Sequence, residues 1–137
     1  MFGESRRPMV VLARMNAAEL TQALYSAKRE VDMAFEVYRE AISNDAICDD
    51  KRRRAMARAT ISCREQQPKA TVGVIEAMVD LETADVQMSA RLAEGLKRTA
   101  GMAVDAKKQW LSALQSLASL TKAEAQLAAW EPREVSA

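Results

Sequence analysis

The first half of the chain carries an apolar pattern with the period of an α-helix. Seven residues follow one another at intervals of three and four, namely Leu20, Leu24, Ala27, Val31, Ala34, Tyr38 and Ala41. Such spacing places them on one helix face. Asn16 and Glu19 have the spacing of a capping box, with Met15 and Leu20 as a hydrophobic staple. We expect a helix over about residues 17–43 that ends at Ser43-Asn44-Asp45.

The next stretch predicts a second, more polar helix. Asp49 can cap its start and Asp50 favours the positive end of the helix dipole. The helix must end before Pro68, because proline lacks the backbone N–H and restricts the residue before it. This segment is the least apolar of the predicted helices.

Beyond Pro68, Thr71 is placed to cap a third helix, whose apolar residues are Val74, Ile75, Met78, Val79, Leu81, Val86, Met88, Leu92 and Leu96. A fourth helical stretch ends before Pro132 and contains Val104, Trp110, Leu111, Leu114, Leu117, Leu120, Leu127 and Trp130. Gly101 leaves two architectures open, a turn between these helices or one continuous helix of about 60 residues. The short connection favours the continuous helix, since helix–helix connections usually take about two to eight residues.

These elements predict an all-α fold of three or four long amphipathic helices, arranged as a helical bundle or as an extended antiparallel coiled-coil-like hairpin. We expect an N-terminal arm over residues 1–15, a single helical domain over 16–131 and a C-terminal tail over 132–137. The chain has 137 residues, of which 49% are hydrophobic and only 4% aromatic. A core built largely from alanine buries little area, which favours pairing with a second copy or a helical partner.

Charge and cysteine content limit the cellular locations and binding partners that we expect for the protein. The net charge of +1 gives no global attraction to nucleic acid or to an anionic membrane. The apolar run after Arg6-Arg7 is too short for an export signal, and no segment has the ~20 apolar residues of a membrane span. Cys48 and Cys63 are expected as reduced thiols, so we expect a cytoplasmic protein that does not enter a membrane.

Catalytic chemistry is not indicated by the sequence. The chain contains no histidine, which removes the commonest general base and metal ligand. Two carboxylate pairs share a helix face, Glu36 with Glu40 and Glu76 with Asp80, but they lack the histidines of helical di-metal sites. We therefore expect no enzymatic activity, no cofactor and no metal.

One local signal is a basic cluster in the second predicted helix. Its members are Lys51, Arg52, Arg53, Arg54, Arg58 and Arg64. Such a cluster can bind a nucleic-acid backbone or an acidic partner. Alternatively, an antiparallel neighbouring helix can neutralise it, because residues 71–94 carry Glu76, Asp80, Glu82, Asp85 and Glu94 against Arg91 alone. The absence of stacking aromatics nearby favours neutralisation.

Large apolar side chains supply candidate interface residues. They are Met9, Val10, Val11, Leu12, Trp110, Leu114, Leu117 and Trp130. The apolar run in the N-terminal arm is expected to dock, on its own chain or on a neighbour. The sequence thus favours a non-catalytic helical scaffold, adaptor or chaperone-like subunit that associates with copies of itself or with a helical partner. The alternative is an accessory subunit of a nucleoprotein complex that uses the basic cluster.

Overall fold

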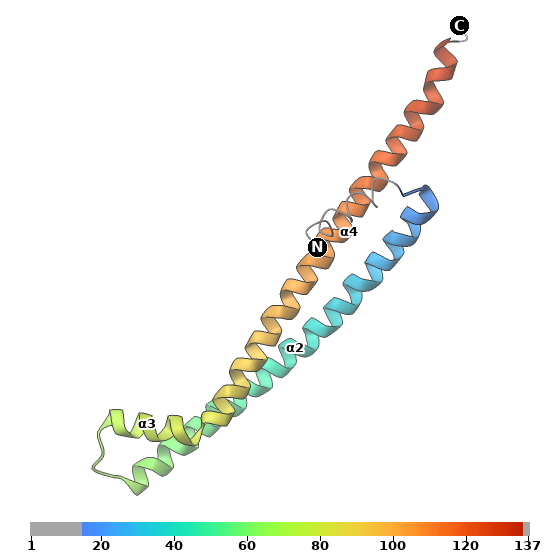
Figure 1. The fold of residues 1–137 in the computed structure, drawn as a ribbon. Helices are drawn as coiled ribbons and strands as arrows, with labels where there is room; N and C mark the ends of the chain where they lie inside the picture. Colours follow the sequence, from blue (N-terminus) through green and yellow to red (C-terminus); the bar gives the residue numbers. More distant parts are fainter. Residues whose placement is uncertain (1–14, 136–137) are drawn as a thin grey trace, which may run out of the picture. The chain divides into compact units, whose positions relative to one another are not determined.

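The computed structural model describes residues 15–135, with side-chain environments for residues 15–130. The described residues form three helices, α2 (Ala17–Gln66), α3 (Val72–Glu82) and α4 (Ala84–Val135), and contain no strand (Figure 1). The predicted all-α fold is therefore confirmed. The predicted N-cap is also present, since the Glu19 backbone N–H donates to Asn16 Oδ1 at 2.8 Å, and the Asn16 side-chain amide donates to Glu19 Oε1 at 3.2 Å.

The predicted break between the first two helices is wrong, because α2 continues through Ser43, Asn44 and Asp45 without interruption. Asp45 occupies the next position in the three-and-four spacing after Ala41. Its Oδ2 accepts a hydrogen bond from Lys97 Nζ of α4 at 2.8 Å, and the two groups form an ion pair. The side chain of Asp49 accepts from arginines one turn later instead of capping a new helix. Asp45 therefore belongs to the packed helix face, whereas Ser43 and Asn44 are exposed residues within a continuous helix.

The helical structure is instead interrupted at Thr83, between α3 and α4. This position was not predicted from the sequence. Thr83 is only 3% exposed, and its hydroxyl donates to the backbone oxygen of Val79 at 2.7 Å. Its backbone leaves the helical region and ends α3. At the other end of α3, the predicted cap is confirmed, since the Val74 N–H donates to Thr71 Oγ1 at 3.4 Å.

Helix α4 settles the alternatives at Gly101, which lies inside the helix and makes no turn. The predicted helix end before Pro132 is wrong, because α4 extends to Val135. A proline removes its own backbone donor, but the residues that follow it can keep helical dihedral angles.

The described chain forms two compact units. Among the described residues, the first comprises residues 15–34 and 104–135, within which the beginning of α2 packs antiparallel to the later part of α4 (Figure 1). Its core is formed by Leu20, Ala27 and Leu114. Around these pack Met15, Ala23, Leu24, Trp110, Leu111, Leu117 and Ala118. An ion pair between Lys107 and Glu30, 3.2 Å long, fixes which residues of the two helices lie opposite each other.

The second unit, residues 35–103, contains the remainder of α2, all of α3 and the beginning of α4. The core between α2 and α3 consists of Ala59, Cys63, Ile75 and Val79. Where α2 meets α4, a Cβ atom built on Gly101 would lie 3.5 Å from the ring of Tyr38. The absence of a side chain at Gly101 thus leaves the space that the tyrosine ring approaches.

The less exposed positions of both long helices recur at intervals of three and four. Along α4 they are Ala93, Lys97, Ala100, Val104, Lys107, Leu111, Leu114, Ala118 and Thr121. Along α2, every seventh residue of this face is small: Ala27, Ala34, Ala41, Cys48, Ala55 and Ser62. This is the heptad spacing of coiled coils, with alanine in place of the usual larger residues.

Candidate interaction surfaces

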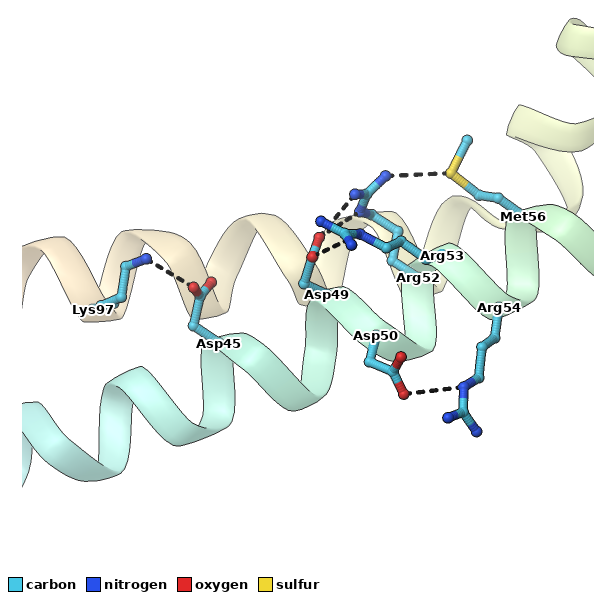
Figure 2. A network of polar contacts seen from close by, with 8 residues as sticks. All are labelled: Asp45, Asp49, Asp50, Arg52, Arg53, Arg54, Met56 and Lys97. Atoms are coloured by element: carbon cyan, nitrogen blue, oxygen red, sulfur yellow. Dashed lines mark hydrogen bonds and ion pairs between the residues drawn. The ribbon is translucent and has the colours of Figure 1, made fainter.

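Half of the basic cluster is neutralised by carboxylates of α2 itself. Arg52 Nη2 lies 2.8 Å from Asp49 Oδ1, and Arg53 Nε lies 3.0 Å from Asp49 Oδ2 (Figure 2). One residue farther along the helix, Arg54 Nε lies 3.1 Å from Asp50 Oδ2. The sequence analysis sought the neutralising acids on the neighbouring helix, but these three arginines contact acids three or four residues earlier, an arrangement that favours the helix locally.

Polar contacts shift the pKa values of two side chains in this region, Asp49 and Lys97. The hydrogen bond from Arg52 holds the pKa of Asp49 below its ordinary value, helped by the nearby charges of Arg53 and Lys97 and opposed by desolvation. The hydrogen bond to Asp45 raises the pKa of Lys97, and the charge of Asp45 adds to this effect. Both groups keep their charged forms over a wider pH range, so Lys97 is ion-paired with Asp45 of α2, and Asp49 with the arginines of its own helix, at neutral pH.

A hollow of about 280 Å³ lies between α2 and α4 in the second unit. Acidic and basic side chains share its lining, which consists of Asp45, Asp49, Arg52, Gln87, Ala90, Arg91 and Glu94. Because both signs of charge are present, this hollow gives no strong preference for an anion or a cation. Among residues 15–130, no group of three or more cysteine or carboxylate side chains is placed to hold a metal ion.

The other basic residues face more open surroundings. Among the described residues, no carboxylate lies within ion-pair distance of Lys51, Arg58 or Arg64. Lys51, Arg54 and Arg58 line an open hollow of about 510 Å³ on α2, together with Ala46, Ile47, Asp50 and Ala55. The side chain of Arg64 instead borders a hollow between α2 and α3 that Glu76 and Asp80 also line.

The predicted interface residues have different environments. Leu114 is fully buried, and Trp110 and Leu117 are half-buried against the core of the first unit. Trp130 is 64% exposed. Met9, Val10, Val11 and Leu12 lie outside the described residues. Of the described candidates, Trp130 alone presents most of its surface to solvent.

The sequence analysis missed an exposed apolar face on α4 in the second unit. Met88, Leu92, Leu96 and Met102 are 56–67% exposed. Their spacing places them on one side of the helix, with Gly95 and Thr99 between them. The opposite side of α4 packs through Ala90, Ala93 and Ala100. We define Met88, Leu92, Leu96 and Met102 as the α4 face.

The two sides of these helices differ in the size of their apolar side chains. Among the described residues, sixteen large apolar side chains are exposed, whereas the buried core contains only six, Leu20, Val31, Ile75, Val79, Val104 and Leu114. Single exposed apolar residues are ordinary, but several on one helix face mark an interaction surface. The feature of the sequence that indicates the packed side is the recurrence of small residues at heptad spacing. The leucines, which lie on another side of the helix, suggest a different packed side.

Comparison with protein-family models, curated proteins and solved structures finds no match to this chain. Within the described part of the chain, none of the helices combines the length and the apolar content needed to cross a membrane.

Proposed function

We propose that the protein is a non-catalytic helical scaffold or adaptor subunit that associates with a second copy of itself through the α4 face. The observation that carries this proposal is the exposure of Met88, Leu92, Leu96 and Met102 on one side of a helix whose other side is already packed. Facing helices can cover such a stripe by groove or bundle packing.

The size of the α4 face indicates a reversible contact. Full burial of a leucine or methionine contributes about 1.5–3 kcal/mol, so four side chains on each of two copies, each 56–67% exposed, offer roughly 10 kcal/mol. This gain lies within the range of what association costs in lost freedom of motion, about 4–15 kcal/mol. The net free energy of association through the α4 face is therefore small, and the fraction associated depends on protein concentration.

Light scattering coupled to size-exclusion chromatography tests this proposal over a concentration series. The double variant Leu92→Glu/Leu96→Glu places charge on the α4 face and should remain monomeric where the unchanged protein self-associates. The matched control is Ile47→Glu/Ile61→Glu, which alters two exposed apolar residues outside the α4 face. Circular dichroism checks that all variants keep their helices. An unchanged protein that is monomeric at every concentration would contradict self-association.

A second candidate function is supported by the open basic hollow of α2. Lys51 and Arg58, which lack an ion pair among the described residues, could bind the phosphates of a nucleic acid in a nucleoprotein complex. Binding to single-stranded RNA or duplex DNA should weaken as salt rises and be lost in Lys51→Glu/Arg58→Glu. Lys28→Glu/Arg29→Glu makes the same charge change at exposed positions elsewhere on α2 and is the control. Failure of the unchanged protein to bind at low salt would reject this candidate.

A further inference from the structure

The end of α4 is an apolar helix segment that the described residues do not cover. All nine side chains from Lys122 to Trp130 are exposed. Six of the nine are alanine, leucine or tryptophan, namely Ala123, Ala125, Leu127, Ala128, Ala129 and Trp130. Figure 1 shows α4 continuing past the beginning of α2 within the first unit. This segment, residues 122–130, is called the α4 extension below.

The packed face of α4 continues into the extension. Leu114, Ala118 and Thr121 are buried or half-buried where α2 lies beside them. The same three-and-four spacing leads on to Ala125 and Ala128, which are exposed. Leu127 and Trp130 flank these alanines and are 67% and 64% exposed. The helix thus keeps the pattern that packs against a neighbour beyond the point where α2 begins.

The N-terminal end of α2 lies beside the part of α4 that directly precedes the α4 extension. Residues 1–14 join the described structure at Met15, which packs on the core of the first unit with Leu117 and Ala118. They include four consecutive uncharged apolar residues, Met9 to Leu12. Leu12 precedes Met15 by three positions, a reach of roughly 10 Å in an extended chain.

The antiparallel arrangement directs this segment toward the α4 extension. Glu30 lies opposite Lys107 in the first unit, so residues nearer the N-terminus lie opposite residues later in α4. Continued at this register, residues 9–12 fall opposite about residues 125–128. An extended chain covers more length per residue and brings the same side chains toward Trp130.

We propose that residues 9–12 pack on the α4 extension of their own chain and cover Leu127 and Trp130. Both surfaces are apolar, and each is too small for a stable contact between separate molecules. The short connection through Met15 makes the contact intramolecular, with an effective concentration of the order of millimolar.

Fluorescence of Trp130 tests the contact in the full chain. The substitution Trp110→Phe leaves Trp130 as the only tryptophan. In this background, Val10→Asp/Leu12→Asp should move the Trp130 emission to longer wavelength and increase its quenching by acrylamide, because water reaches the indole. The control Arg6→Ala/Arg7→Ala changes the same segment without touching its apolar residues and should leave both readings unchanged. Circular dichroism establishes that the Trp110→Phe background keeps its helices.

Two results would overturn this proposal. The first is a Trp130 emission and quenching that Val10→Asp/Leu12→Asp leaves unaltered. The second is a difference between the two proteins that disappears on dilution, because a second copy then supplies the covering segment. The variant Leu92→Glu/Leu96→Glu should not change the Trp130 signal, so failure of the proposed self-association and failure of this contact are separate outcomes.

Discussion

The two units of the protein use the same helix spacing with different chemistry. In the first unit, the packed face carries Leu20, Ala27 and Leu114, and its core is apolar. In the second unit, the corresponding face of α2 includes Asp45 and Arg52, and that of α4 includes Lys97. Partly exposed ion pairs contribute little to stability, whereas buried leucine contributes strongly. The packing of α2 with α4 should therefore depend on apolar burial more strongly in the first unit than in the second.

Removal of the largest buried side chain of the first unit should have the largest effect. Leu114 is 0% exposed, so Leu114→Ala loses apolar burial and leaves a cavity. The free energy of unfolding should fall by about 2–5 kcal/mol, measured by urea denaturation at fixed protein concentration. Leu120→Ala is the matched control, since Leu120 is 60% exposed and its truncation should change stability by no more than about 0.5 kcal/mol. Equal losses in both variants would contradict the assignment of the core.

Enlargement of a small packed residue should come next. Ala27 is 2% exposed between the helices of the first unit, so the extra carbons of Ala27→Leu have no space without displacing α4. We expect a loss of about 1–3 kcal/mol in the free energy of unfolding, measured in the same way. The same substitution at the exposed residue Ala106 should be nearly neutral. A neutral Ala27→Leu would mean that the alanine spacing does not set how closely the helices pack.

The contrast between the units also explains what the sequence could predict. The apolar run from Leu20 to Ala41 and the cap at Asn16 located the start of α2 correctly, because burial and polarity agree there. Farther along α2, the packed face becomes polar at Asp45, and a hydrophobicity pattern cannot distinguish a packed ion pair from a helix end. The pairing with Lys97, 52 residues later in the chain, is a tertiary contact that local spacing does not contain.

A second limit concerns which side of α4 is packed. The third predicted helix contained Met88, Leu92 and Leu96 among its apolar residues, without an indication of which of them pack. In the structure, Ala93 and Ala100 occupy the packed side, and the larger residues are exposed. Likewise, the break at Thr83 lacks the proline or glycine that usually marks one. The position of the candidate site could therefore not be predicted without knowing which helix faces pack together. The all-α class could be predicted from the sequence alone.

The two glycines within α4 should give a smaller effect of opposite sign. A Cβ atom on Gly95 meets nothing within 4 Å, and one on Gly101 meets Tyr38 at an ordinary contact distance. Gly95→Ala and Gly101→Ala should each stabilise the protein by about 0.5–1 kcal/mol, because alanine loses less backbone entropy in a helix. Thermal unfolding followed by circular dichroism measures this gain. Destabilisation by Gly101→Ala alone would show that Tyr38 cannot yield to the added methyl group.

The smallest effect should be the pH dependence of the ion pair in the second unit. Asp45 raises the pKa of Lys97, so the protonated lysine is favoured in the folded protein. The stability that this provides is fully present below the unfolded pKa of about 10.4 and is lost as the pH rises through the higher folded value. The difference in stability between the unchanged protein and Lys97→Met should therefore shrink above about pH 10.4. Urea denaturation across this range measures the difference, and a constant gap between the two curves would show that the Asp45–Lys97 contact does not favour the protonated lysine.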